Sequence, residues 1–113
     1  MSSLRIAIPT RGKRKLANKV AETFSRAPNF TIVTVENGQI KDVIVIDNPG
    51  KIPKRGAGPL AASVLKDNHV NLLLTGEMGP GAKSILEAFD INIEIVQEGR
   101  KVSDVIQPYI TSL

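Results

Sequence analysis

Apolar residues in the first half of the chain recur with the two-residue period of β-strands. Leu4, Ile6 and Ile8 fall on one face of an extended segment, which predicts a buried strand at 4–9. Residues 30–35 and 40–46 are mostly β-branched or otherwise apolar, and Asn37-Gly38 lies between them. Both turn residues accept a positive φ, so this pattern predicts two antiparallel strands joined by a tight turn.

In the second half the pattern changes to strands that alternate with helices. Two prolines and three glycines exclude regular structure from residues 47–58, which are therefore predicted to form a long loop. The elements predicted after this loop are a helix at 59–67, a strand at 71–75, a turn at 76–79, a helix at 80–89, a strand at 91–96 and a helix at 102–110.

This order of elements predicts an α/β fold. Strands that alternate with helices are joined by right-handed crossovers and lie parallel, whereas the hairpin adds antiparallel strands. The expected architecture is a mixed five-stranded sheet with helices on both faces, in three α/β/α layers. The length of 113 residues suits one domain that covers residues 1–113. The alternating strand at 91–96 suits a sheet edge, so a monomer or a small homo-oligomer is expected.

Composition and charge narrow the classes of function. The chain has no cysteine, which excludes disulfides and thiolate ligands to zinc or iron-sulfur clusters. The first apolar run is too short to span a membrane, and a cytoplasmic protein without a membrane partner is expected. Residues 1–58 hold eleven Lys or Arg against four acids, a net charge of +7, whereas residues 59–113 hold four against seven, a net charge of −3. The first half is therefore the half expected to face an anion.

Three loops that follow predicted strands carry the candidate chemistry. They span 10–15, 47–58 and 76–81; two are rich in glycine and lead into helices, and two are basic. Ligands of α/β sheets gather where strands end, and helix N-termini offer free amide groups to anions. The three loops are therefore expected to converge at one end of the sheet and to form a single electropositive cradle.

Four short motifs, in order along the chain, resemble the dinitrogenase iron-molybdenum cofactor biosynthesis family. They lie at 6–10, 24–30, 56–62 and 75–82. The resemblance implies a ribonuclease H-like fold and a carrier or accessory protein whose relatives bind the iron-molybdenum cofactor or its precursors. Where the family usually reads His-Phe-Gly, this chain has Thr23-Phe24-Ser25, so the imidazole that could contact a metal cluster is absent.

Together, the loops and the resemblance predict a non-enzymatic binding or carrier protein for an anionic metal-sulfur cluster or a similar anionic ligand. Backbone amides would hold the ligand, and Arg11 and Arg26 would neutralise it. The predicted binding residues are Thr10, Arg11, Gly12, Thr23, Arg26, Gly56, Gly58, Gly76, Glu77 and Gly79.

Two other functions use some of the same residues. The cations of the first half could bind nucleic acid weakly and without sequence preference, although the aromatic residues that usually accompany such binding are few. A magnesium-dependent hydrolase of the ribonuclease H type would need converging carboxylates, for which Asp47 and Glu77 are the candidates.

Overall fold

The strands and the first two helices lie close to where the sequence predicts them. The computed structural model describes residues 3–51 and 56–110. Its strands are β1 (Ser3–Thr10), β2 (Asn29–Glu36), β3 (Gln39–Asp47), β4 (Leu72–Thr75) and β5 (Asn92–Ile95). The helices in the described ranges are α1 (Ala57–Asp67), α2 (Pro80–Ala88) and α3 (Val102–Val105), with 3-10 turns η1 (Lys15–Ala17), η2 (Pro49–Lys51) and η3 (Gln107–Tyr109).

The sheet is mixed, as predicted. Its strand order is β3-β2-β1-β4-β5. β2 pairs with β1 and with β3 in antiparallel fashion, whereas β4 lies parallel to both β1 and β5. The β2–β3 turn confirms the Asn-Gly signal, because Asn37 and Gly38 have φ angles of 54° and 79°, as a two-residue turn of this type requires.

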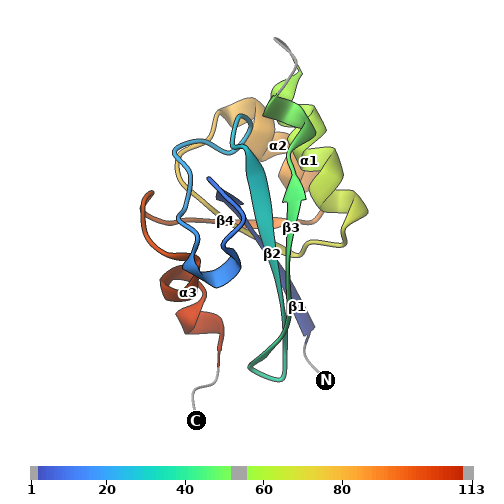
Figure 1. The fold of residues 1–113 in the computed structure, drawn as a ribbon. Coiled ribbons are helices and arrows are strands. Elements are labelled where there is room, and N and C mark those ends of the chain that lie inside the picture. The colour runs from blue at the N-terminus through green and yellow to red at the C-terminus, as the bar shows by residue number, and fades with distance from the viewer. Residues whose placement is uncertain (1–2, 52–55, 111–113) are drawn as a thin grey trace.

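Helices cover both faces of the sheet, and Figure 1 shows α3 on one side with α1 and α2 on the other. Alternate residues of β1 therefore enter different cores. Ala7 packs in the core below α1 and α2, whereas Ile6 and Ile8 pack in the core below α3. The three-layer arrangement follows from this alternation; the ribonuclease H-like motif stays a prediction.

The last helix differs from the prediction. Residues 102–110 were expected to form one helix, but α3 ends at Val105 and η3 covers Gln107–Tyr109. Pro108 has no amide hydrogen and disfavours the helical conformation of the residue before it, so the chain turns at this point. None of the described helices combines the length and the apolar character that a membrane span requires.

Candidate functional site

The ends of several strands meet at one end of the sheet, which we call the rim. Thr10 at the end of β1 pairs with Asn29, and Asn29 pairs with Asp47 at the end of β3. On the other side of β1, Thr75 at the end of β4 is the partner of Ile95 at the end of β5. The three loops that follow β1, β3 and β4 thus start from one end of the sheet, as expected, although residues 52–55 of the second loop lie outside the described ranges.

An irregular segment, residues 18–22, crosses the rim and divides it. Ala21 N–H donates to the carbonyl of Pro9 at 2.8 Å, which fastens the segment to the end of β1. Val20 N–H donates to the carbonyl of Arg100 at 2.9 Å, and Val102 N–H donates to the carbonyl of Asn18 at 2.8 Å. These hydrogen bonds hold the segment between β1 and the chain before α3. Its first residues, Asn18 and Lys19, line one hollow, and its last residue, Glu22, lines another.

The first hollow, which we call the rim pocket, has a volume of about 430 Å³. It brings together three of the predicted residues, Thr23, Glu77 and Gly79. The other residues that line it are Glu22, Phe24, Ser25, Met78 and Ala82. The rim pocket therefore joins the segment where the family motif departs from His-Phe-Gly to the glycine turn before α2.

Two packing contacts place these segments against each other. Phe24 is buried, and its ring lies 5.6 Å from that of Phe30, so it anchors the segment that carries Thr23 and Ser25. Gly76 packs against the other segment, because a Cβ atom there would lie 3.2 Å from the carbonyl oxygen of Glu22. Gly76 is thus a close-packing residue beneath the pocket, and a side chain would push the two walls apart.

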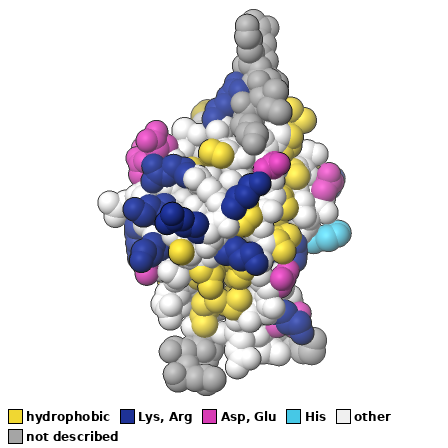
Figure 2. All heavy atoms as spheres, in the orientation of Figure 1, with side chains coloured by type: hydrophobic (Ala, Val, Ile, Leu, Met, Phe, Trp, Pro, Cys, Tyr) yellow, Lys and Arg dark blue, Asp and Glu magenta, His cyan; other side chains and the backbone are white. Residues whose placement is uncertain are grey.

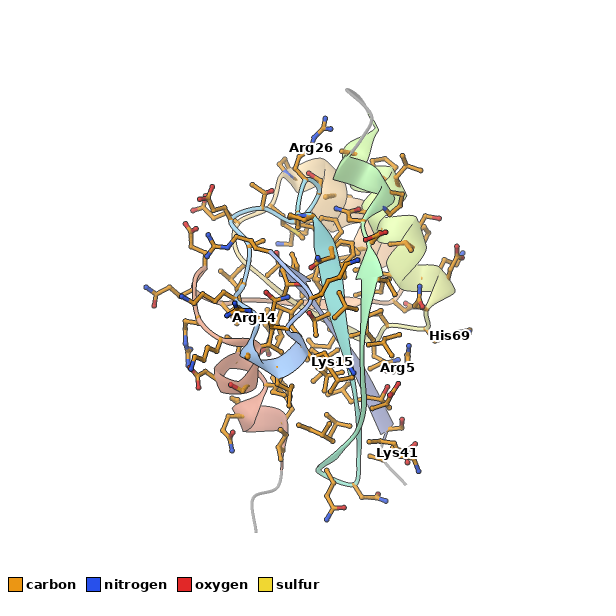
Figure 3. The ribbon with its side chains drawn as sticks, in the orientation of Figure 1. Arg5, Arg14, Lys15, Arg26, Lys41 and His69 are labelled. Atoms are coloured by element: carbon orange, nitrogen blue, oxygen red, sulfur yellow. The ribbon has the colours of Figure 1, made fainter. Side chains whose placement is uncertain are left out.

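The second hollow, which we call the basic hollow, has a volume of about 360 Å³ and holds Arg11 and Gly12 from the predicted set. Lys13, Arg14, Ala17, Asn18 and Lys19 complete its lining. The Asn18 side-chain amide donates to the carbonyl of Gly12 and closes the loop on itself. Figure 3 shows Arg14 and Lys15 next to the η1 turn, and Figure 2 shows Lys and Arg side chains gathered on this part of the surface.

The positive charge of the basic hollow is not compensated. Within the described ranges, the one ion pair joins Lys41 to Glu36 at 3.4 Å, and no lining residue of the basic hollow is acidic. The backbone amides of residues 12–14 also donate to no other described residue. Uncompensated cations on one concave surface favour a bound anion, and neighbouring amides without a protein acceptor are free to donate to it.

The expectation of one shared electropositive cradle is wrong. The rim pocket is lined by two glutamates and by no lysine or arginine, whereas four cations line the basic hollow. The charge separates because the segment at 18–22, which sequence alone places in a loop, is bonded to both β1 and the chain before α3. An anion is therefore attracted to one hollow more than to the other.

The remaining predicted residues line neither hollow. Thr10 is fully buried, and its hydroxyl donates to Asn29 Oδ1 at 2.5 Å, so this side chain holds the end of the strand together. Arg26 Nη1 donates to the carbonyl of Gly50 at 3.4 Å, on the side of the molecule that carries η2 (Figure 3). Gly56 precedes α1 with a φ of 75°, and Gly58 packs against α2, since a Cβ atom on it would lie 3.5 Å from the Cβ of Ala82.

The described residues contain no site that could coordinate a metal ion directly. Among the described residues, no group of three His, Asp or Glu is arranged so that it could hold a metal ion, and the chain has no Cys. Asp47 ends β3 and Glu77 follows β4, and these strands are three positions apart in the sheet, which is about 14 Å at the usual strand spacing. The two carboxylates therefore do not share one magnesium ion, and the hydrolase alternative loses its candidate residues.

Several residues that line the two hollows are not among the binding residues predicted from the sequence. Ser25 and Met78 line the rim pocket, and Lys13, Arg14 and Lys19 line the basic hollow. The run of basic residues was visible in the sequence, but its concave shape was not. That shape depends on Asn18, whose side-chain amide bonds the carbonyl of Gly12. Met78 also packs against the core below α2, so the thioether fills space there as well.

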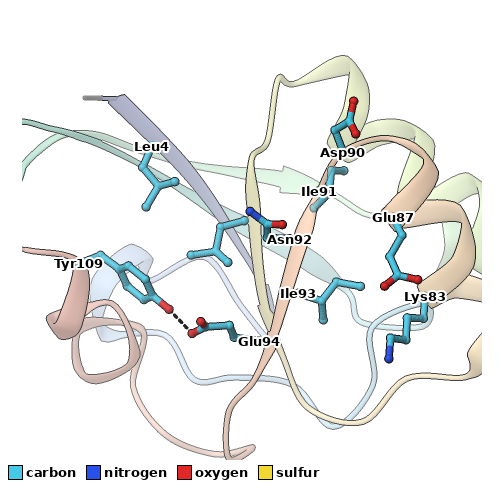
Figure 4. Close-up of a pocket in the computed structure, with 10 residues that line it drawn as sticks. Leu4, Lys83, Glu87, Asp90, Ile91, Asn92, Ile93, Glu94 and Tyr109 are labelled. Atoms are coloured by element: carbon cyan, nitrogen blue, oxygen red, sulfur yellow. Dashed lines mark hydrogen bonds between the residues drawn. The ribbon is translucent and has the colours of Figure 1, made fainter. Parts of the chain in front are cut away.

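A larger hollow of about 790 Å³ surrounds β5, away from the rim (Figure 4). In this hollow the Tyr109 hydroxyl donates a hydrogen bond to Glu94. Burial, that hydrogen bond and the carboxylate charge raise the pKa of Tyr109 to about 12.

This raised pKa predicts a loss of stability in strong alkali. Below about pH 10, Tyr109 is protonated in both the folded and the unfolded chain, so it adds no pH dependence. Between about pH 10 and 12 the unfolded chain releases this proton first, and the free energy of unfolding falls. Denaturant unfolding across this range should show a smaller fall for Tyr109→Phe than for the wild type. Equal falls would mean that Tyr109 titrates normally.

Comparisons with known proteins agree with this architecture. The family model described as dinitrogenase iron-molybdenum cofactor matches residues 3–112. The apo form of the orange protein from Desulfovibrio gigas is 32% identical, with a TM-score of 0.81 over 93% of this chain and 85% of its own. The NMR structure of a candidate NifB protein from Thermotoga is 29% identical, with a TM-score of 0.76 over 94% of this chain and 86% of its own.

A curated relative adds support at the level of sequence. An uncharacterized protein of Methanocaldococcus jannaschii is 32% identical over 76 residues, which are 67% of this chain. The match spans 64% of the length of that relative. The family model covers nearly all of the described residues, including both hollows of the rim. The chain belongs to the dinitrogenase iron-molybdenum cofactor family.

Proposed function

We propose that this chain is a non-enzymatic binding or carrier protein for a small anionic ligand, and that an anionic metal-sulfur cluster is the class of ligand it takes. The observation that carries the proposal is the basic hollow, where four cations without an ion pair to any described residue surround a concave loop. A loop that concentrates uncompensated charge in this way is stabilised by a bound anion.

The chemistry of the rim supports a preassembled ligand rather than a bare metal ion. A metal ion alone would need several protein ligands, and the described residues offer no such group. A cluster that already carries its own sulfide ligands needs only charge and hydrogen bonds from the protein. Guanidinium groups and free amides supply both, and the fact that Arg11 and Gly12 line the basic hollow supports this assignment.

The family and its relatives point to the same class of ligand. The family is described by the iron-molybdenum cofactor of dinitrogenase. The orange protein is described as an apo form, a term used for a protein without its bound group. The rim pocket carries the hydroxyl groups of Thr23 and Ser25 but also two glutamates, so the basic hollow is the part of the rim that would hold the anion.

Anaerobic titration with tetrathiomolybdate, a compact dianion of molybdenum and sulfur, tests the proposal. We expect the double variant Arg11→Ala/Arg14→Ala to bind this anion about tenfold more weakly than the wild type, because two charges of the hollow are lost. Lys66→Ala is the matched control, since it removes a cation that lies over the Phe89 ring, outside the basic hollow. Absorption spectra follow the binding, and circular dichroism verifies the folding of each variant.

The same variants separate this proposal from nucleic-acid binding. The basic hollow has no aromatic residue in its lining, so it lacks the stacking platform that single strands use. We therefore expect weak retention of single-stranded or duplex DNA that disappears as the salt concentration rises. Tight DNA binding with no response to tetrathiomolybdate would overturn the carrier proposal, as would equal affinities for the anion in all three proteins.

A further inference from the structure

β5 is an edge strand, and no further strand of the described residues pairs with its outer side. β4 is its one partner in the strand order. Asn92 N–H donates to the carbonyl of Asn71 at 2.9 Å, and Val96 N–H donates to the carbonyl of Thr75 at 2.8 Å. Because successive residues of a strand turn their backbone groups to opposite sides, Ile93 and Ile95 direct their N–H and C=O groups away from the sheet.

Polar and apolar side chains alternate along β5, whose sequence is Asn-Ile-Glu-Ile. Ile93 packs in part against the core below α2, and Ile95, at 64% exposed, is the most exposed of the large apolar residues in the described chain. Beside them is a hollow of about 330 Å³, which Met78, Lys83 and Glu77 also line. An apolar side chain on an added strand would enter this hollow and cover Ile95.

The charge around the edge is negative. Three acids line the larger hollow of about 790 Å³ around β5: Glu94 on the side of Tyr109, and Glu87 and Asp90 on the side of α2 (Figure 4). Lys83 is the one cation that lines this larger hollow. This edge belongs to the acidic half of the chain, whose net charge is −3 from four Lys or Arg and seven acids. A segment that adds to β5 is therefore favoured if it carries lysine or arginine.

A second copy of this chain fits the edge poorly. A two-fold antiparallel pair centred on Glu94, the register that keeps all outward-facing pairs within the bounds of β5, places each Ile93 opposite an Ile95. The residue between them, Glu94, then faces its own copy at the close spacing of a non-hydrogen-bonded pair. Like charges directly opposite each other destabilise a sheet, so self-pairing is disfavoured.

We propose that the open edge of β5 is a docking site for an extended, basic segment of a partner protein, which adds to the sheet as a sixth strand. Its backbone bonds Ile93 and Ile95, and its apolar side chains enter the hollow beside Met78. Its cations alternate with these and point to the opposite face, the side of Glu94. Glu77 and Met78 line both this hollow and the rim pocket, so the docked segment lies next to the rim.

A blocked hexapeptide of alternating lysine and valine serves as the probe. We expect it to shift the NMR signals of the Ile93 and Ile95 amides and to slow their exchange with solvent. The same peptide with N-methyl groups on alternate residues keeps its charge and side chains but loses the donors of one edge, and we expect it to bind about tenfold more weakly. A glutamate-valine peptide of equal length should not bind.

Protein variants give a second, independent test. Ile95→Pro removes an outward amide on the proposed edge, and Ile40→Pro makes the same change at an exposed position of β3, the other edge strand. We expect the first to weaken binding of the lysine-valine peptide about tenfold and the second to leave it unchanged. If Ile95→Pro does not fold, the proposal is tested by comparing the binding of the N-methylated and the unmodified lysine-valine peptide to the wild-type protein. Equal binding of the methylated peptide, shifts confined to β3, or a dimer held through β5 would overturn the proposal.

Discussion

Gly50→Ala is expected to destabilise the protein by about 3 kcal/mol, the cost of forcing a side chain into a filled space. Gly50 is buried within η2, between the rim segment at 25–27 and the start of α1. A Cβ atom there would lie 2.6 Å from the carbonyl oxygen of Ala57 and 2.7 Å from that of Ser25. Both neighbours are backbone atoms, so neither moves without displacing an element.

Thermal unfolding followed by circular dichroism measures this loss, which corresponds to a fall in Tm of roughly 12 °C for a domain of this size. Gly81→Ala is the matched control, because Gly81 lies in the first turn of α2 and no atom is within 4 Å of its added Cβ. That variant should be as stable as the wild type or more stable by about 0.5 kcal/mol, since alanine favours helices. A fall of less than about 3 °C for Gly50→Ala would show that η2 moves freely.

Asn48→Ala is expected to destabilise the protein by about 2 to 4 kcal/mol, because one fully buried side chain satisfies three backbone groups. Its Nδ2 group donates to the carbonyls of Ser25 and Ala27, both at 2.9 Å. Its Oδ1 atom accepts from the amide of Gly50 at 2.8 Å. Alanine leaves these two carbonyl groups and this amide without their side-chain partner. It also loosens the segment that contributes Ser25 to the lining of the rim pocket.

Asn48→Asp separates the loss of hydrogen bonds from the loss of volume. This change keeps the acceptor for Gly50 and replaces the two donors by a carboxylate that faces two carbonyl oxygens. We expect it to be at least as destabilising as Asn48→Ala at neutral pH and to recover in part in acid, where protonation restores one donor. Denaturant unfolding at several pH values tests this, and a loss below about 1 kcal/mol for both variants would mean that water replaces the side chain.

Local chemistry was enough to place most of the elements. The Asn37-Gly38 turn and the β-branched runs on either side of it predicted β2 and β3, and the proline at position 80 marked the start of α2. These signals are short-range, since they depend on the φ angles that a residue accepts and on which face of a strand it occupies. The end of α3 was missed although Pro108 was visible, because the apolar spacing up to Ile110 favoured a longer helix.

The division of the rim could not be predicted from the sequence. The segment at 18–22 has no strong strand or helix pattern, and its position follows from hydrogen bonds to Pro9, to Arg100 and from Val102. Arg100 and Val102 lie near the other end of the chain from Pro9, so only folding brings these partners to the segment. Likewise, no sequence pattern indicated that Asn48 holds Ser25 in place, because the two lie 23 residues apart and meet only after the sheet has formed.

By itself the sequence determined the order of strands and helices, the mixed sheet, the excess of positive charge in the first half and the absence of thiolate chemistry. The tertiary structure alone decided that Arg11 belongs to one hollow and Thr23 with Glu77 to another, and that β5 has an open, acidic edge. The physical reason is range. Backbone conformation and burial pattern are encoded by near neighbours, whereas a pocket is made by side chains that only the pairing of distant strands brings together.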